Sequence, residues 1–180
     1  MKITISRINL KRLLSACDSK NNNRFYRQLH IKKDGKDINY YTTNCALIAK
    51  YTIKEIDEQA ENVTLVFPEK IKILKTKLYE IGKDNDNYYL QIYHYPESRQ
   101  HLQKWQGVAP DFERLIKDQT EGATLANDYI CYHPVNYAIA YEILGNAILA
   151  CPLTRGSKYA SIWNSIDKNW QVLLMPVKIS

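Results

Sequence analysis

The spacing of apolar residues changes along the chain, and each spacing predicts one kind of element. Ile3 and Ile5 alternate with polar neighbours, which is typical of a half-buried strand over 2–6. The next apolar stripe has helical spacing and consists of Leu10, Leu13, Leu14 and Cys17. Further strands are predicted over 24–33, 38–43 and 46–53. This part of the chain therefore predicts the order strand–helix–strand–strand–strand, with a tight hairpin turn at Asp34-Gly35.

A second unit repeats this order. It begins with a strand over 63–67, and Pro68 is placed where the first turn of a helix tolerates proline. The spacing of one helical face is given by Ile71, Leu74 and Leu78. The end of this helix stays open, because 77–81 is also compatible with the start of a strand. A tyrosine-rich strand is predicted over 88–95, and the polar stretch 97–106 predicts a loop or a short helix.

A third unit follows 108–117. It consists of a short strand over 123–127 and a helix over 132–144, which Pro134 begins and Gly145 ends. Three more strands are predicted over 147–153, 159–163 and 170–177. The three units indicate an α+β fold built from a structural repeat of about fifty to sixty residues.

Composition and charge limit the class of protein. Hydrophobic residues make up 45% of the 180 residues and charged residues 24%, as in ordinary soluble globular proteins. The net charge of +6 is compatible with a polyanionic partner. The first stretch, MKITISRINLKRLL, has no apolar run long enough for a signal peptide or a membrane span. We therefore expect a soluble, cytoplasmic protein with no membrane partner.

The sequence offers little material for catalysis. The six glycines stand singly, which excludes a glycine-rich phosphate loop. The cysteines Cys17, Cys45, Cys131 and Cys151 form no CxxC pair, so we expect free thiols in a reducing compartment. Cys131 and His133 could supply two metal ligands, but no second pair completes a four-ligand site. A Cys–His catalytic pair stays open, because such partners meet only in the fold. We expect a protein that is not an enzyme and uses no cofactor or metal.

Two of the predicted helices carry cations away from their apolar stripes. The first helix has Arg7, Lys11 and Arg12, and the second has Lys70, Lys72, Lys75 and Lys77. Such a face is often simply solvated. Equivalent cations in two units would also contact a duplex backbone, with salt-sensitive and sequence-independent binding. The third helix breaks the pattern, since it offers Asn136, Tyr137, Tyr141 and Glu142 without Lys or Arg.

The last stretch, 169–180, is written NWQVLLMPVKIS and has two interpretations. Its apolar residues predict a strand that completes a sheet. Alternatively, Met175-Pro176-Val177 lines a surface groove where a partner peptide docks.

Five segments carry a family resemblance. The segments Arg24-Phe25-Tyr26 and 41–49 (YTTNCALIA) resemble RYYLNG and ATDGHRLA motifs. Residues 109–116 (APDFERLI) resemble FPDYRRVI, and 174–179 (LMPVKI) resemble a closing VMPMRL. Tyr132-His133-Pro134 is similar to an FNP that opens a last helix. In this order the segments resemble the bacterial sliding clamp, the beta subunit of DNA polymerase III, and especially its short phage or plasmid relatives.

The resemblance implies an architecture. A clamp domain is a pair of strand–helix–strand–strand–strand units, with helices lining a DNA channel and sheets outside. Residues 1–118 would form one such domain and 119–180 a half domain, which together make about one and a half clamp domains. The resemblance also implies a homo-oligomer, and four such chains would supply the units of a closed ring.

The resemblance further implies two sets of site residues. Arg24 and Tyr26 match the family's DNA-contacting loop and join the basic residues above. The peptide-binding groove would consist of Thr43, Ile48, Pro110, Arg114, Leu115, Met175, Pro176 and Val177. An apolar pocket with one arginine on its rim suits a short motif with buried side chains. The chain departs from the family at 44–47, where DGHR becomes NCAL, and at Arg27, which replaces a groove leucine.

The sequence leaves three functional hypotheses. The first is a non-enzymatic, clamp-like replication accessory protein that binds duplex DNA through basic helices and clamp-binding motifs of replication proteins through the groove. The second is a clamp-fold interaction module, or a competitor for clamp-binding peptides, that does not bind DNA. The neutral third helix favours this second hypothesis. The third is an enzyme on another α+β fold, which the lack of convergent catalytic groups disfavours.

Overall fold

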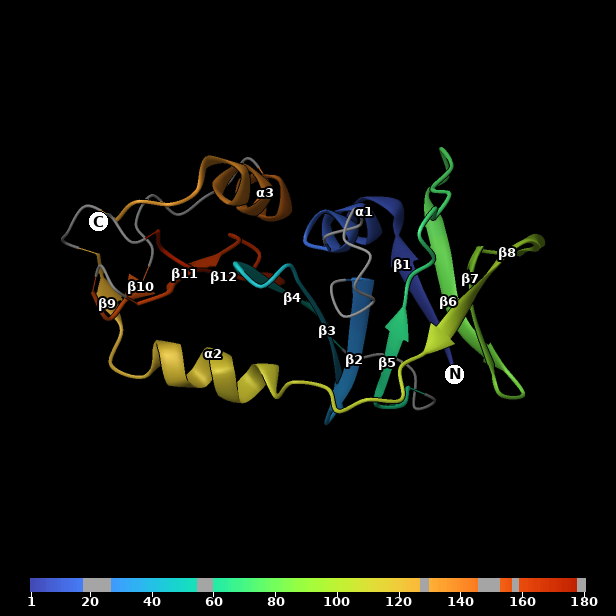
Figure 1. Ribbon diagram of the computed structural model, residues 1–180. Helices are drawn as coiled ribbons and strands as arrows, with labels where there is room; N and C mark the ends of the chain where they lie inside the picture. The colour runs from blue at the N-terminus through green and yellow to red at the C-terminus, as the bar shows by residue number, and fades with distance from the viewer. Residues whose placement is uncertain (18–26, 55–59, 127–129, 146–152, 157–158, 178–180) are drawn as a thin grey trace.

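The computed structural model describes residues 1–17, 27–54, 60–126, 130–145, 153–156 and 159–177. Within these ranges twelve strands form a continuous sheet (Figure 1). The strands are β1 (Lys2–Ser6), β2 (Gln28–Asp34), β3 (Asp37–Thr43), β4 (Leu47–Ile53), β5 (Val63–Val66), β6 (Leu78–Asp84), β7 (Asn87–Ile92), β8 (Tyr95–Lys104), β9 (Thr124–Leu125), β10 (Leu153–Thr154), β11 (Ser161–Asn164) and β12 (Trp170–Leu174). The helices are α1 (Arg7–Ser15), α2 (Phe112–Thr120) and α3 (Pro134–Leu144). The predicted α+β fold is confirmed.

The first two units exchange their first strands. The strand order is β1-β6-β7-β8-β5-β2-β3-β4-β12-β11-β10-β9. β1 of the first unit pairs antiparallel with β6 of the second, from Lys2↔Gly82 to Ser6↔Leu78. In return, β5 of the second unit pairs antiparallel with β2 of the first. Each unit thus depends on the other for one strand, so the two units form a single body.

The third unit joins the first through the C-terminal strand. β12 pairs antiparallel with β4, from Trp170↔Tyr51 to Leu174↔Leu47. The prediction that this strand completes a sheet is therefore confirmed. The strand ends at Leu174, three residues before the predicted end, because Pro176 has no N–H to donate to a ladder. The Val177 N–H instead donates to the Cys131 carbonyl at 2.8 Å.

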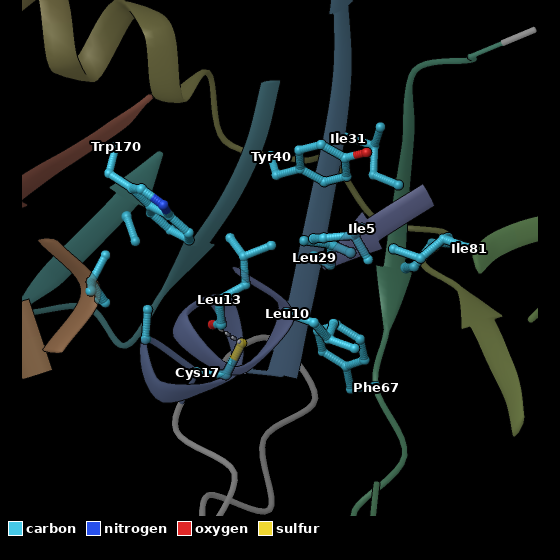
Figure 2. Packing of buried hydrophobic residues seen from close by; sticks show 14 of the residues in the cluster. Ile5, Leu10, Leu13, Cys17, Leu29, Ile31, Tyr40, Phe67, Ile81 and Trp170 are labelled. Atoms are coloured by element: carbon cyan, nitrogen blue, oxygen red, sulfur yellow. Dashed lines mark hydrogen bonds between the residues drawn. The ribbon is translucent and has the colours of Figure 1, made fainter. Parts of the chain in front are cut away.

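Helices cover both faces of the sheet. In Figure 1, α1 and α3 lie side by side on one face, and α2 lies on the other. The main core lies under α1, where Leu10 and Leu13 are fully buried against the sheet residues that Figure 2 labels. The Ser6 side chain caps α1 by accepting from the Asn9 N–H at 3.3 Å. The predicted stripe of the first helix is thus confirmed.

The prediction of a helix after Pro68 is wrong. Residues 69–77 contain no helix and run without regular structure between β5 and β6. Ile71 and Ile73 pack against the main core, whereas the lysines between and after them are exposed. The sequence KIKI in fact alternates with a period of two, which fits an extended chain better than the helical spacing of Ile71 and Leu74.

The loop or short helix predicted over 97–106 is also wrong. Residues 97–104 belong to β8, which pairs with β7 and, at its end, with β5. Its exposed, polar side chains hide the strand from a pattern analysis, because ladder hydrogen bonds rather than burial hold it. The helix predicted over 132–144 and the hairpin are confirmed, with Gly35 at φ +59° in the turn. Parts of the strands predicted over 24–33 and 147–153 lie outside the described residues.

Candidate functional site

The face that carries α1, α3 and segment 67–77 is called the helix-side face. The four lysines of the predicted second helix are exposed there, although the helix is absent. Their segment lies beside α1, because the Arg7 N–H donates to the Lys77 carbonyl at 2.9 Å and Ile71 packs on the same core as α1. Figure 1 shows the segment rising on the same side of the sheet as α1. The structure thus brings these lysines next to the cations of α1.

The cations of α1 differ in their solvent exposure and in their contacts. Lys11 is exposed, whereas Arg7 and Arg12 are half-buried. The Arg12 guanidinium lies over the Trp170 ring at 5.8 Å and occupies the space that a Cβ on Gly145 would need, so it lies between β12 and the end of α3. A groove of about 480 Å³ separates α1 from α3 and is lined by Ile8, Lys11, Arg12, Tyr141, Glu142 and Gly145. Arg24 and Tyr26, the other predicted DNA contacts, lie outside the described residues.

On the opposite face, Glu113 fastens α2 to the sheet. Its carboxylate accepts hydrogen bonds from the Tyr41 hydroxyl at 2.7 Å and from Lys32 Nζ at 3.0 Å. These interactions, led by the Tyr41 hydrogen bond, hold the pKa of the Glu113 carboxyl below its ordinary value, and partial burial opposes them. Asp111 caps the helix by accepting from the Arg114 N–H at 3.2 Å. This helix was not predicted from the sequence.

Three of the predicted groove residues meet at one end of the sheet. Thr43 and Ile48 are register partners on β3 and β4, and Ile48 packs against Phe112 and Ile116 of α2. The Met175 N–H donates to the Ala46 carbonyl at 2.9 Å and extends the ladder of β12. Because Met175 follows Leu173 by two residues, it lies on the same side as Ile48. Its side chain is 45% exposed.

The other groove residues are placed by α2 and by the chain end. Leu115 is half-exposed, and Arg114 faces solvent with an ion pair to Asp118 at 3.8 Å. Pro110 precedes the helix, and Pro176 and Val177 follow β12. The departure at 44–47 covers the β3–β4 turn and the first residue of β4, and Cys45 in this turn adopts a left-handed φ of 72° at the position of the motif's glycine.

A hollow at the start of α2 was not predicted from the sequence. It has a volume of about 400 Å³, and its walls include His30, Tyr41, Thr64, Trp105, Pro110, Phe112 and Glu113. Burial lowers the pKa of His30 to about 4, so the imidazole is neutral near pH 7. His30 Nδ1 lies 2.9 Å from Thr64 Oγ1, and the ring packs edge-on against Phe112. Residues this far apart in sequence give no local signal.

The described ranges contain no cluster of metal-ligating side chains. Within them, no three His, Cys, Asp or Glu side chains gather closely enough to hold a metal ion. Burial raises the pKa of the Cys17 thiol to about 12, so this cysteine is a poor nucleophile. Cys131 and His133 are exposed. None of the helices in the described ranges combines the length and the apolar character needed to span a bilayer.

With its strand-exchanged units and a sheet that continues across the unit junction, the chain has the sliding-clamp fold, of which it holds about one and a half domains. Solved structures share this fold along nearly the whole chain. A protein from Eubacterium rectale described as a DNA polymerase III beta subunit superposes with a TM-score of 0.67 at 10% identity, covering 98% of this chain and 65% of its own.

Two further clamps give the same result. The DNA polymerase III subunit beta of Borrelia burgdorferi has a TM-score of 0.65 at 12% identity, with coverages of 100% and 63%. A DNA polymerase sliding clamp of Pseudomonas aeruginosa has a TM-score of 0.62 at 13% identity, with coverages of 99% and 66%. The chain thus spans slightly less than two thirds of these proteins. No protein-family model and no curated protein sequence matches the chain.

Proposed function

We propose that the protein is a non-enzymatic, sliding-clamp-like accessory factor of DNA replication that binds duplex DNA through its helix-side face. The observation that carries this proposal is the set of exposed lysines beside α1 on the helix side of a clamp fold. Lysines on an irregular segment reach phosphates as well as lysines on a helix do, because phosphate contacts need charge and access rather than one backbone geometry.

Salt dependence of duplex binding tests this proposal. The variant Lys70→Ala/Lys72→Ala/Lys75→Ala removes three exposed cations from the helix-side face. The control Lys36→Ala/Lys54→Ala/Lys117→Ala removes three exposed cations from the β2–β3 turn, the end of β4 and α2, and changes the net charge equally. Each lost phosphate contact reduces the slope of log K against log salt by about 0.9, so we expect the first variant to lose about 2 to 3. Equal slopes for the two variants would refute the proposed DNA face.

We further propose that the opposite face binds clamp-binding motifs through the eight groove residues. Ile48 supplies an apolar floor between α2 and β12, and Leu115 and Met175 offer half-exposed apolar surface with Arg114 at the rim. Met175→Asp and Arg114→Ala should each weaken a clamp-motif peptide in calorimetry, whereas Val108→Asp, an exposed valine before α2, should not. Peptide affinity that ignores Met175→Asp would exclude this groove.

The alternative, an interaction module or competitor without DNA binding, is favoured by α3, which has neither Lys nor Arg, and by the engagement of Arg12 with Trp170. Peptide binding without salt-dependent duplex binding would select it. We also propose a homo-oligomeric ring and a two-unit domain over 1–118 followed by a half domain over 119–180. The mass in solution, with and without duplex DNA, tests the ring. Limited proteolysis near the end of α2 tests the boundary.

A further inference from the structure

Two tyrosine rings project from α3 on the helix-side face. Tyr137 and Tyr141 are 42% and 46% exposed. They are four residues apart on one helix, so they lie one turn apart on the same side. Tyr132 stacks on the Tyr137 ring at 6.1 Å and Trp163 meets it edge-on at 6.0 Å, which fixes its orientation. A ring held in this way loses little side-chain entropy when a flat ligand stacks on it.

Cations lie beside these rings but not on the same helix. Tyr141 lines the α1–α3 groove together with Lys11 and Arg12 of α1. Across α1, the exposed lysines of segment 67–77 continue the positive surface. Aromatic platforms next to a cationic track are the combination that binds single-stranded nucleic acid, because every base has a face to stack and every nucleotide a phosphate to neutralise.

The spacing of the rings distinguishes a single strand from a duplex. Four helical residues separate them by about 6 Å along the axis, whereas nucleotides of a duplex strand are spaced by about 3.4 Å. Bases inside a duplex are also covered by their neighbours and cannot stack on a side chain. We propose that the α1–α3 groove binds single-stranded nucleic acid, with one base on Tyr141 in the groove, the next on Tyr137 one turn earlier on α3, and phosphates at Lys11 and the neighbouring lysines.

This inference shares the helix-side face with the proposed function but depends on the rings rather than on duplex binding. Fluorescence anisotropy would compare a labelled thymidine oligonucleotide, a uridine oligonucleotide and a duplex of equal length. Tyr141→Ala should weaken both single strands by about tenfold, because one stacked base contributes about 1–3 kcal/mol. Tyr141→Phe should retain the affinity, since the ring stays. The control is Tyr95→Ala on β8, a tyrosine that is 56% exposed, and should change nothing.

Glu142, the one acidic residue among those that line the groove, provides a second test. Its carboxylate repels phosphate, so Glu142→Gln should tighten both single strands, and this variant removes no packing. Single strands that do not bind, or that bind Tyr141→Ala and Tyr95→Ala equally well, would overturn the inference. A mass from light scattering that halves in Tyr141→Ala would also overturn it, because a second copy of the chain would then cover the rings. If this inference fails but the duplex still binds, the proposed function stands. If single strands bind but the duplex does not, the inference stands and the proposed duplex binding fails.

Discussion

Replacing Glu113 by alanine tests how α2 is held to the sheet. The carboxylate accepts a hydrogen bond from the hydroxyl of Tyr41, a residue that is only 1% exposed. It also forms an ion pair with the half-exposed Lys32. A hydrogen bond to a charged group contributes about 1.5–3 kcal/mol. The ion pair adds a few tenths of a kcal/mol at most, because solvent screens it. We therefore expect Glu113→Ala to lower the free energy of unfolding by about 2 kcal/mol.

A double-mutant cycle isolates the Tyr41 contribution. Tyr41→Phe removes the hydroxyl but keeps the ring stacked on Phe112 at 5.4 Å. If the hydrogen bond carries the effect, the two variants should show a coupling energy of about 1–2 kcal/mol in urea unfolding followed by circular dichroism. A coupling below about 0.5 kcal/mol would refute this assignment, even if each variant alone were destabilised.

The pH dependence gives an independent check. The folded-state pKa of Glu113 is lowered, so its contribution is complete above the unfolded pKa of about 4.3 and is lost as the pH falls through the lower folded value. The difference between the wild-type protein and Glu113→Ala should therefore be constant from pH 7 to about pH 5 and shrink below that. A difference that grows on acidification would contradict the assignment.

Three further substitutions have expected outcomes. Folding lowers the pKa of His30 to about 4, so the unfolded chain takes up a proton first as the pH falls from 6.5. The free energy of unfolding should therefore fall by roughly 3 kcal/mol between pH 6.5 and 4, and His30→Gln should remove this decrease. Parallel curves for the two proteins would contradict this. A Cβ on Gly82 would lie 2.3 Å from the Tyr89 ring, whose hydroxyl donates to Glu80. Gly82→Ala should therefore cost about 1–3 kcal/mol in thermal unfolding, and less in a Tyr89→Leu background. Cys45→Gly should raise stability by about 0.5–1 kcal/mol, because Cys45 has a left-handed φ of 72°; a lower melting temperature would count against this reasoning.

Elements whose buried face follows one period could be predicted. The stripe of Leu10 and Leu13 places α1, and Pro134 and Gly145 bracket α3. Prediction failed where two periods overlap, as in KIKILK, and where polar residues form a strand, as in β8. Of the candidate site, the exposure of the four lysines follows from their charge alone. Their position beside α1 on a segment without a helix does not follow from the sequence, because the tertiary packing of Ile71 and Ile73 decides it.

The sequence by itself determined local matters: which side chains face inward on α1, where β2 and β3 turn at Gly35, and that the last apolar stretch is a strand. The tertiary structure alone decided the partners. The exchange of β1 and β5, the junction of β4 with β12, and the Tyr41–Glu113 hydrogen bond each join residues tens of positions apart. Apolar periodicity reports the face that a residue buries, whereas the surface that it buries against depends on the shape and register of the whole chain. The strand Trp170–Leu174 was thus predictable, but its placement beside β4, with Met175 on the side of Ile48, required the fold.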